Sequence, residues 1–341
     1  MATTLLDLGF DDSFSVGPEF LPARVTRVDR GACDVLGADG ELRVSFSGAL
    51  RRASAQDPVA LPCVGDWVAI DPSTQEIVSV LPRRTAIVRA GVTPGTSHGQ
   101  VLAANVDLVY IAEPAVPSVD LGRIERLLAL AWESGAQPVV VITKADLADV
   151  DLEVVAEAAP GAEVVAVSSH TGDGLDIVRL RPGRTAVLLG RSGAGKSTLV
   201  NALSGAEAME TQAIREADGR GRHTTVHREL LLLPGGGMII DTPGLRSIGL
   251  HAEEGLAQAF SDVEELAERC RFSDCSHDSE PGCAVRAAVE EGILPERRLL
   301  SWHKLQREAS WMASRTDARL RAEQERKWKI IHKSMRGRSR P

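Results

Sequence analysis

The sequence predicts a multidomain protein with an N-terminal OB-fold β-barrel, a central α/β domain and a C-terminal, mostly helical domain. Short β-like segments crowd residues 21–85, and apolar strands alternate with helical segments across residues 98–255. The C-terminal region, residues 256–341, includes a stretch at 315–329 that lacks Gly and Pro and should be helical. Residues 1–20 carry little pattern, so we expect them to form a flexible lead-in.

The barrel is predicted from five short segments that alternate or cluster apolar side chains: 24–28, 32–35, 42–46, 66–70 and 76–80. Turn residues separate them, and five strands in so short a stretch suggest a small closed barrel, most simply an OB-fold. OB-folds often bind RNA or single strands, whereas a purely structural barrel is the alternative. Positive charge near the loops comes from Arg51, Arg52, Arg83 and Arg84.

A phosphate-binding pattern opens the second half of the central domain. Residues 190–197 match G-x-x-x-x-G-K-[ST], between an apolar strand at 186–189 and a helix at 198–203. Lys196 would reach the β- and γ-phosphates and assist hydrolysis, while the Ser197 hydroxyl would ligate Mg²⁺. A glycine-rich turn that only opens a helix is the alternative. The pattern predicts a nucleoside triphosphate site with magnesium, formed by Gly190, Arg191, Ser192, Gly193, Ala194, Gly195, Lys196, Ser197 and Thr198.

The base of the bound nucleotide is predicted from an apolar strand earlier in the chain, at 139–142. This strand ends in Thr143, Lys144, Ala145 and Asp146. This segment resembles the [NT]-K-x-D motif of GTPases, in which the carboxylate accepts hydrogen bonds from two guanine donors that adenine lacks. A strand that simply ends in polar residues is the alternative. A second loop, which begins at Ser168 and Ser169 after the apolar run 164–167, resembles the one whose backbone amide contacts the guanine oxygen.

Two further segments would respond to the γ-phosphate. Asp241 and Gly244 form a D-x-x-G match after a strand at 237–240; the carboxylate would hold Mg²⁺ through water, and the Gly244 amide would sense the phosphate. Residues 219–225 are glycine-rich and polar, as suits a switch loop in which Thr224 or Thr225 offers a hydroxyl to the metal. A solvated surface connection is the alternative for this loop.

The order of these motifs is unusual, because the base-reading pair precedes the phosphate loop. A parallel sheet permits this order, since every motif lies at the C-terminal end of a strand and all of them meet at one edge. Residues 98–255 therefore look like a circularly permuted GTPase domain. In this arrangement the segment after D-x-x-G runs directly into the next domain.

That next domain contains a predicted zinc site. Three thiols and one imidazole within fourteen positions suit one structural, tetrahedral zinc. Disulfides are one alternative, disfavoured because no secretory signal opens the chain and a nucleotide hydrolase of this type belongs in a reducing compartment. Isolated buried cysteines are the other, and Cys33 and Cys63 fit that description. The predicted zinc ligands are Cys270, Cys275, His277 and Cys283.

Charge is distributed unevenly along the chain. The whole sequence carries 39 basic and 47 acidic residues, a net charge of −8, but residues 301–341 hold 12 Lys and Arg against 4 Asp and Glu. An acidic body with a basic tail is typical of a nucleic-acid-binding extension, and a solvated charged helix with an irregular end is the alternative. No apolar run reaches the roughly 18 residues that a membrane span needs.

Together these features resemble the small-ribosomal-subunit-dependent GTPases of the RsgA or YjeQ family, from about residue 21 onward. The most specific features of this resemblance are the segments 64–68, 221–225 and 241–245 and the spacing of the predicted zinc ligands. The resemblance implies a cytoplasmic factor that binds the 30S subunit and its 16S rRNA late in maturation. The subunit would stimulate hydrolysis of GTP to GDP and phosphate, and hydrolysis would release the factor. Thr143 stands where the family usually has Asn, although its hydroxyl can still bridge to the phosphate loop.

Hydrolysis is expected to need help from outside the domain. Leu245 stands where Ras-like enzymes place a glutamine that orients water, so intrinsic turnover should be slow. We hypothesise that His223 positions the attacking water once rRNA orders its loop. Two other functions remain open: a P-loop ATPase or kinase that acts on a small substrate, and a non-catalytic RNA-binding scaffold. We expect a monomer.

Overall fold

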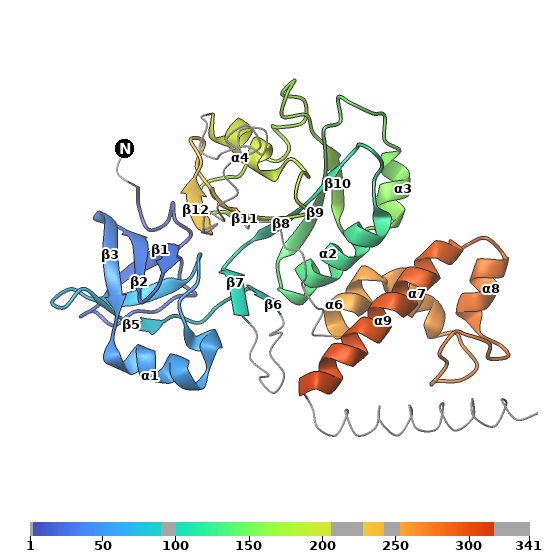
Figure 1. Ribbon diagram of the computed structural model, residues 1–341, viewed down its shortest axis with the longest axis horizontal. Coiled ribbons are helices and arrows are strands. Elements are labelled where there is room, and N and C mark those ends of the chain that lie inside the picture. The colour runs from blue at the N-terminus through green and yellow to red at the C-terminus, as the bar shows by residue number, and fades with distance from the viewer. Residues whose placement is uncertain (1–2, 90–99, 206–227, 242–252, 317–341) are drawn as a thin grey trace, which may run out of the picture.

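One continuous sheet of 11 strands passes through the barrel and the central domain, and a helical region follows. The computed structural model describes residues 3–89, 100–205, 228–241 and 253–316. The barrel, the α/β region and the helical region lie in a row, with the helix of the phosphate loop at the top of the middle part (Figure 1). The three predicted parts of the chain are therefore confirmed.

The barrel consists of five strands and one helix: β1 (Leu21–Asp29), β2 (Ala32–Gly37), β3 (Gly40–Phe46), α1 (Gly48–Gln56), β4 (Trp67–Asp71) and β5 (Glu76–Val80). The strands run in the order β1-β2-β3-β5-β4, and β4 pairs back onto β1, which closes the barrel. Alternate apolar side chains such as Val25, Val35 and Ile77 fill its interior. The predicted barrel is confirmed, and α1 between the third and fourth strands completes the OB-fold connectivity.

The N-terminal segment differs from the flexible lead-in that we expected. Leu8 is fully buried, and Phe14 is 5% exposed. The rings of Phe10 and Phe14 lie 4.8 and 5.9 Å from the buried Trp67 ring, measured between centroids. These apolar side chains pack in the large apolar cluster that also contains Ile87 and Ile240, outside the cluster that fills the barrel, because leaving them in water would cost free energy. Residues 3–20 therefore belong to the folded body.

The α/β region has the strand order β10-β9-β8-β11-β13-β12. Its strands are β8 (Leu108–Pro114), β9 (Gln137–Thr143), β10 (Glu163–Ala166), β11 (Thr185–Leu189), β12 (Glu229–Leu232) and β13 (Met238–Asp241). All of them are parallel except β12, which is antiparallel to β13. Strand β9, which ends in the predicted base-reading segment, and strand β11, which leads into the phosphate loop, are thus separated by one strand, although β9 comes first in the chain.

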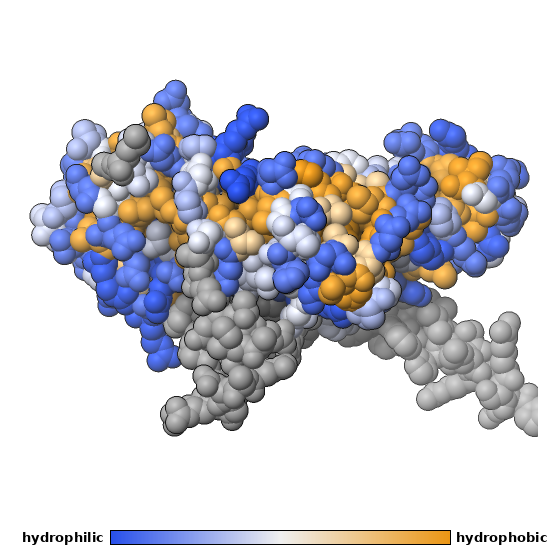
Figure 2. Space-filling view, turned by 90° about the horizontal axis from the view of Figure 1, so that it is seen from above, coloured by the Kyte–Doolittle hydropathy of each residue, from blue (hydrophilic) through white to orange (hydrophobic). Residues whose placement is uncertain are grey.

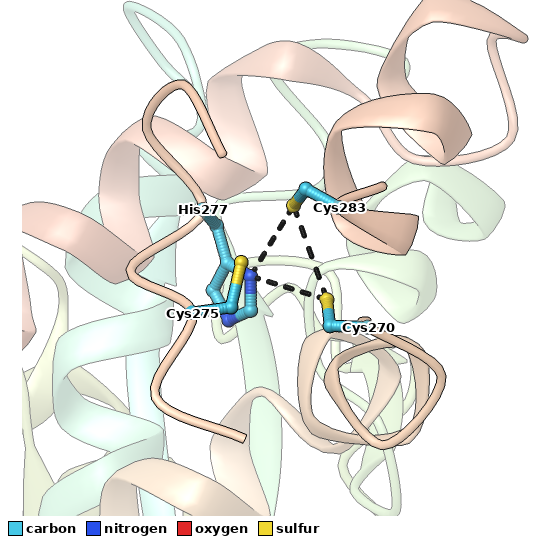
Figure 3. A group of neighbouring side chains, drawn as sticks. All are labelled: Cys270, Cys275, His277 and Cys283. Carbon is cyan, nitrogen blue, oxygen red and sulfur yellow. Dashed lines mark hydrogen bonds between the residues drawn. The ribbon is translucent and has the colours of Figure 1, made fainter. Parts of the chain in front are cut away.

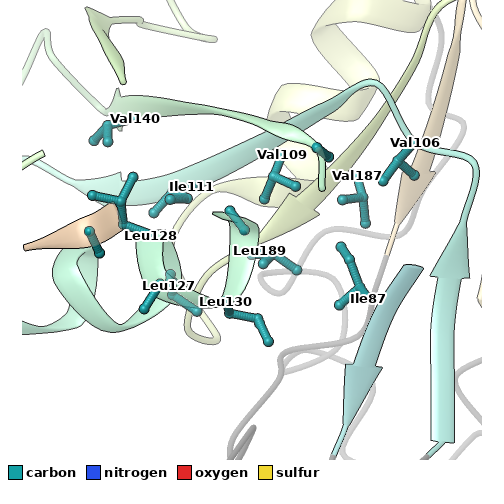
Figure 4. Close-up of a cluster of buried hydrophobic side chains, with 14 of the residues drawn as sticks. Ile87, Val106, Val109, Ile111, Leu127, Leu128, Leu130, Val140, Val187 and Leu189 are labelled. Carbon is teal, nitrogen blue, oxygen red and sulfur yellow. The ribbon is translucent and has the colours of Figure 1, made fainter. Parts of the chain in front are cut away.

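Helices cover both faces of this sheet: α2 (Leu121–Glu133) and α3 (Leu152–Glu157) on one face and α4 (Lys196–Ser204) on the other. Val109, Ile111 and Leu189 pack with Leu128 of α2 in the largest apolar cluster (Figure 4). Leu188 and Leu199 belong to the cluster on the opposite face. The strands are buried on both faces, which explains why they read as continuous apolar runs in the sequence.

Two connections tie the barrel to the α/β region. A ribbon of β6 (Ala86–Arg89) and β7 (Gln100–Ala104) leads from one to the other. In addition, β1 of the barrel pairs with β12 through Arg27 and Glu229, which makes the two sheets continuous.

The C-terminal region contains α6 (Glu253–Ala259), α7 (Ser261–Ala267), α8 (Ala284–Glu290) and α9 (Glu296–Thr316). Helix α6 spans the boundary that we expected at residues 255 and 256. A Cβ at Gly255 would lie 2.3 Å from the Ala129 oxygen, so α6 touches the backbone of α2. The buried Arg298 of α9 bonds Glu125 and Asp262 and fastens this region to α2. Most of the helix predicted at 315–329 lies outside the described residues.

The surface mixes polar and apolar side chains. Viewed from above, apolar side chains are visible along the middle of the molecule, with polar side chains around them (Figure 2). Within the described ranges, no helix combines the length and the hydrophobicity that a membrane crossing requires.

Candidate functional site

The phosphate loop joins the end of β11 to the start of α4, as predicted. Gly190, Gly193 and Gly195 have φ angles of 152°, 81° and 82°, which favour glycine. A Cβ at Gly190 would lie 2.4 Å from the carbonyl oxygen of Ala112 on β8. The loop therefore depends on glycine both for its backbone conformation and for its close approach to the neighbouring strand.

Lys196 lies inside this loop and is only 7% exposed. Its ammonium donates hydrogen bonds of 2.8 Å to the carbonyl oxygens of Gly190 and Arg191. Burial lowers the pKa of Lys196, and the nearby carboxylate of Asp241 partly offsets this effect. A positive charge is thus held within a glycine-rich loop at a helix N-terminus, an arrangement that favours an anion.

The strand β9 brings the predicted base-reading segment against the phosphate loop. The hydroxyl of Thr143 donates to the Ala194 oxygen at 2.7 Å, and the ammonium of Lys144 donates to the Gly193 oxygen at 3.1 Å. The bridge expected from the Thr143 hydroxyl is therefore present. Asp146 is exposed two residues beyond Lys144, so its carboxylate is accessible to a ligand.

The second predicted base loop lies beside the first. The Ala145 amide donates to the Val167 oxygen at 3.1 Å, which joins the two loops. Ser168 is 1% exposed, and its hydroxyl oxygen accepts from two later amides of the same loop. A Cβ at Gly174 would lie 2.2 Å from the Ala166 oxygen. These contacts hold the backbone of the loop in one shape at the edge of the sheet.

The Asp241 carboxylate lies at the same edge. It ends β13, is 6% exposed and stands in register with Leu188 near the end of β11. A buried carboxylate close to the ammonium of Lys196 suits a Mg²⁺ ion bound together with phosphates, and the half-buried Ser197 adds a hydroxyl at the start of α4. The chemistry of the described side chains therefore fits magnesium.

The remaining predicted site residues divide into two groups. Ser169 is half-buried, and the exposed members of the phosphate loop and helix are Arg191, Ser192, Gly193 and Thr198. The switch residues His223, Thr224, Thr225, Gly244 and Leu245 lie outside the described residues, so their predicted roles stay predictions.

The four predicted zinc ligands converge in the helical region (Figure 3). Their ligand atoms lie within 4.8 Å of one another. The Sγ atoms of Cys270 and Cys283 are 3.9 Å apart and lie 3.6 and 3.4 Å from Nδ1 of His277. A tetrahedral zinc with Zn–S bonds of about 2.3 Å requires sulfur–sulfur edges of about 3.8 Å. Cys275 completes the group, and all five cysteines are free thiols.

Neighbouring groups shape this cluster. The Glu280 carboxylate accepts hydrogen bonds from the Ser276 hydroxyl and from the amides of Ser276, Asp278 and Ser279. The Ser276 hydroxyl, followed by backbone amides of the same loop, lowers the pKa of Glu280 to about 2. His277 adopts a φ of 59° within this loop. The tight loop turns the imidazole toward the thiols, so the donor set and its geometry fit zinc.

One acidic group near the site was missed in the sequence. Glu113 is 1% exposed at the end of β8, and its Oε1 accepts from the Asp120 amide at 3.2 Å and from Arg123 at 2.6 Å. These hydrogen bonds hold the loop that follows β8. Glu113 is the neighbour of Ala112, whose carbonyl oxygen lies close to Gly190 of the phosphate loop. The signal was a charged residue at the end of an apolar strand.

The chain is similar to several known proteins. A family model described as RsgA GTPase matches residues 80–251. The small ribosomal subunit biogenesis GTPase RsgA of Streptomyces coelicolor is 52% identical, over 96% of this chain and 92% of that protein. The protein of the same name from Opitutus terrae is 44% identical, over 99% of this chain and 98% of that protein. The crystal structure of YjeQ from Thermotoga maritima superposes with a TM-score of 0.63 and 28% identity, over 85% of this chain and 98% of that one. The crystal structure of YloQ, described as a circularly permuted GTPase, shares the fold. It superposes with a TM-score of 0.60 and 24% identity, over 86% of this chain and 96% of that one.

Proposed function

The chain belongs to the RsgA GTPase family, and from this premise we propose that it hydrolyses GTP to GDP and phosphate during biogenesis of the small ribosomal subunit. The observation that carries the proposal is the contact between the two halves of the nucleotide site. Thr143 and Lys144, which precede the base-reading Asp146, bond directly to the phosphate loop.

Each side chain has a role that follows from its chemistry. The exposed carboxylate of Asp146 accepts hydrogen bonds from N1–H and the exocyclic amine of guanine, and adenine leaves it unpaired. The Lys196 ammonium exchanges its two carbonyl partners for phosphate oxygens. Ser197 and Asp241 would hold magnesium, which would supply positive charge to neutralise the phosphates.

The attacking water is positioned by His223, which lies in the predicted switch loop with Thr224 and Thr225. An apolar residue, Leu245, follows the D-x-x-G segment, so the intrinsic rate is low and the ribosomal subunit stimulates it. The support for this part of the proposal comes from the sequence, because these residues lie outside the described structure.

The partner is the 30S subunit, bound through its 16S rRNA in the cytoplasm. Two features support RNA as the contact: an OB-fold barrel with exposed Arg51 and Arg52 on helix α1, and a C-terminal segment of net charge +8 over residues 301–341. Hydrolysis releases the factor. The segment after Asp241 is followed in the chain by α6, which packs on α2, so a change at that segment would be passed on to the C-terminal region. One structural zinc holds the loop that precedes α8.

Phosphate release measured with and without purified 30S subunits tests the function. We expect subunits to raise turnover many-fold and Lys196→Ala to abolish the stimulated rate. A His223→Ala protein with full stimulated turnover would show that His223 does not position the water. An rRNA-binding scaffold predicts no gain in phosphate release.

Competition for a fluorescent guanine nucleotide separates this function from a P-loop ATPase or kinase. GTP should displace the probe at low concentration, whereas ATP should not. Equal displacement by the two nucleotides would favour the ATPase or kinase and remove Asp146 from the base site.

A further inference from the structure

The barrel and the nucleotide site share one sheet. Its register connects a barrel strand to Asp241, whose carboxylate is proposed to hold magnesium. Strand β1 pairs with β12 at Arg27 and Glu229, and β12 pairs with β13 at Glu229 and Asp241. The three residues therefore lie side by side on adjacent strands. Two strand spacings, about 10 Å, separate the barrel backbone from the backbone of Asp241.

A buried guanidinium fastens the same junction. Arg24 on β1 is 1% exposed and donates to the carbonyl oxygens of Leu8, Gly65 and Asn105, the last two at 3.3 and 2.7 Å. These acceptors belong to the N-terminal segment, to a barrel loop and to the chain that enters β8. Burial lowers the pKa of Arg24 to about 10, so the group remains charged at neutral pH. Across the described residues, no carboxylate bonds to this charge.

The same group touches the strand that carries Asp241. Nη1 of Arg24 lies 3.8 Å from Sδ of Met238, the first residue of β13. The barrel loop approaches this strand as well, since a Cβ at Gly65 would lie 3.1 Å from Cδ1 of Ile240. The barrel thus contacts two alternate residues of β13, on the side of the strand opposite to Asp241.

We propose that Arg24 is a positioning residue for GTP hydrolysis, which sets the place of Asp241 by holding β1 and the barrel loop against β13. The inference rests on the proposed function, in which Asp241 holds magnesium. It assigns the barrel a part in the framework of the nucleotide site, in addition to any contact with RNA. A loosened junction moves Asp241 and weakens magnesium binding, while the base and phosphate loops stay intact.

The test uses the full chain and compares Arg24→Met and Arg24→Lys with the wild type. The affinity for a fluorescent GDP analogue is measured in excess Mg²⁺ and in EDTA, and hydrolysis is measured against Mg²⁺ concentration. We expect Arg24→Met to bind the analogue normally in EDTA but to lose most of the gain that Mg²⁺ confers. Its half-maximal Mg²⁺ concentration should rise about tenfold, as loss of a buried hydrogen bond allows. Arg24→Lys keeps the charge and should recover part of the gain.

Arg43→Met is the matched control, since it makes the same change on the same barrel. Arg43 is exposed on β3 and bonds Asp29 and Asp34, away from β13. We expect its Mg²⁺ dependence to equal that of the wild type. Met238→Leu keeps the apolar volume but removes the sulfur, and it should raise the half-maximal Mg²⁺ concentration by a smaller factor.

The outcomes separate the inference from the function. Folded Arg24 variants with a normal Mg²⁺ dependence would overturn the inference. If Arg24→Met does not fold, Arg24→Lys and Met238→Leu decide, and a wild-type Mg²⁺ dependence in both would likewise overturn it. A wild-type protein whose GDP affinity is the same in Mg²⁺ and in EDTA would instead count against the proposed function.

Discussion

The hydroxyl of Thr143 donates a hydrogen bond of 2.7 Å to the carbonyl oxygen of Ala194, which lies 51 residues further along the chain. This bond connects the end of strand β9 to the middle of the phosphate loop across the intervening strand β8. It brings the segment that precedes Asp146 into contact with the phosphate loop, although the segment comes first in the chain. The family's usual Asn is replaced by a shorter side chain that still reaches the loop.

Removing this hydroxyl should weaken nucleotide binding without abolishing it. Thr143→Val keeps the shape of the side chain but leaves the Ala194 oxygen without its partner, at a cost of about 1 kcal/mol, or roughly fivefold in affinity. Titration with a fluorescent GDP analogue measures the effect. Thr143→Ser retains the hydroxyl and should bind as the wild type does. Equal affinities for all three proteins would mean that the bridge plays no part in binding.

Base selectivity should depend on Asp146. Asp146→Ala removes the acceptor of two charge-assisted hydrogen bonds, each worth about 1.5–3 kcal/mol, so GTP affinity should fall at least about 100-fold. ATP affinity, weak already, should stay the same. Competition binding with both nucleotides measures the two constants. Glu153→Ala, an exposed acidic residue on the nearby helix α3, serves as the control and should change neither. A parallel loss of GTP and ATP affinity in Asp146→Ala would point to a damaged fold.

Two glycine variants, one in the phosphate loop and one at the C-terminal end of α4, should separate steric clash from backbone strain. Gly190 and Gly205 both have positive φ, but a Cβ at Gly190 would lie 2.4 Å from the Ala112 oxygen, whereas one at Gly205 meets nothing within 4 Å. Gly205→Ala should lower the free energy of unfolding by about 1 kcal/mol and leave GTP binding intact. Gly190→Ala should in addition abolish binding, because the clash moves the loop. Urea unfolding and nucleotide titration provide the two measurements, and normal GTP binding by Gly190→Ala would contradict the geometry.

One zinc ion per chain should be found by elemental analysis of the purified protein. Cys275→Ser removes one thiolate and should lower the zinc content and the melting temperature, because metal binding contributes to the stability of a site that forms on folding. Cys33→Ala, in the barrel core, should lose stability but keep its zinc. Acid should release the metal as the thiolates take up protons. A zinc-free protein with an unchanged melting temperature would remove the structural role.

Several features could be predicted from the sequence because they depend on short-range chemistry. The strands before Lys196, Asp146 and Asp241 are apolar on both faces, and the polar motifs begin where each strand ends. The parallel sheet then places these ends at one edge, whatever their order in the chain. The predicted zinc ligands are equally local, since all four lie within residues 270–283 and only a short loop has to bring them together.

Other features were decided by tertiary structure. The pairing of β1 with β12 joins residues about two hundred positions apart, and no feature of either segment in the sequence predicted it. The buried Arg24 looked like an ordinary barrel arginine, and the apolar residues of the N-terminal segment formed no periodic pattern. Such contacts depend on which surfaces meet after the domains have folded, and no local pattern encodes that choice.

The sequence by itself determined the chemistry of the nucleotide and metal sites. Only the folded chain decided that the barrel would share a sheet with the nucleotide site, because long-range strand pairing is set by packing between whole domains.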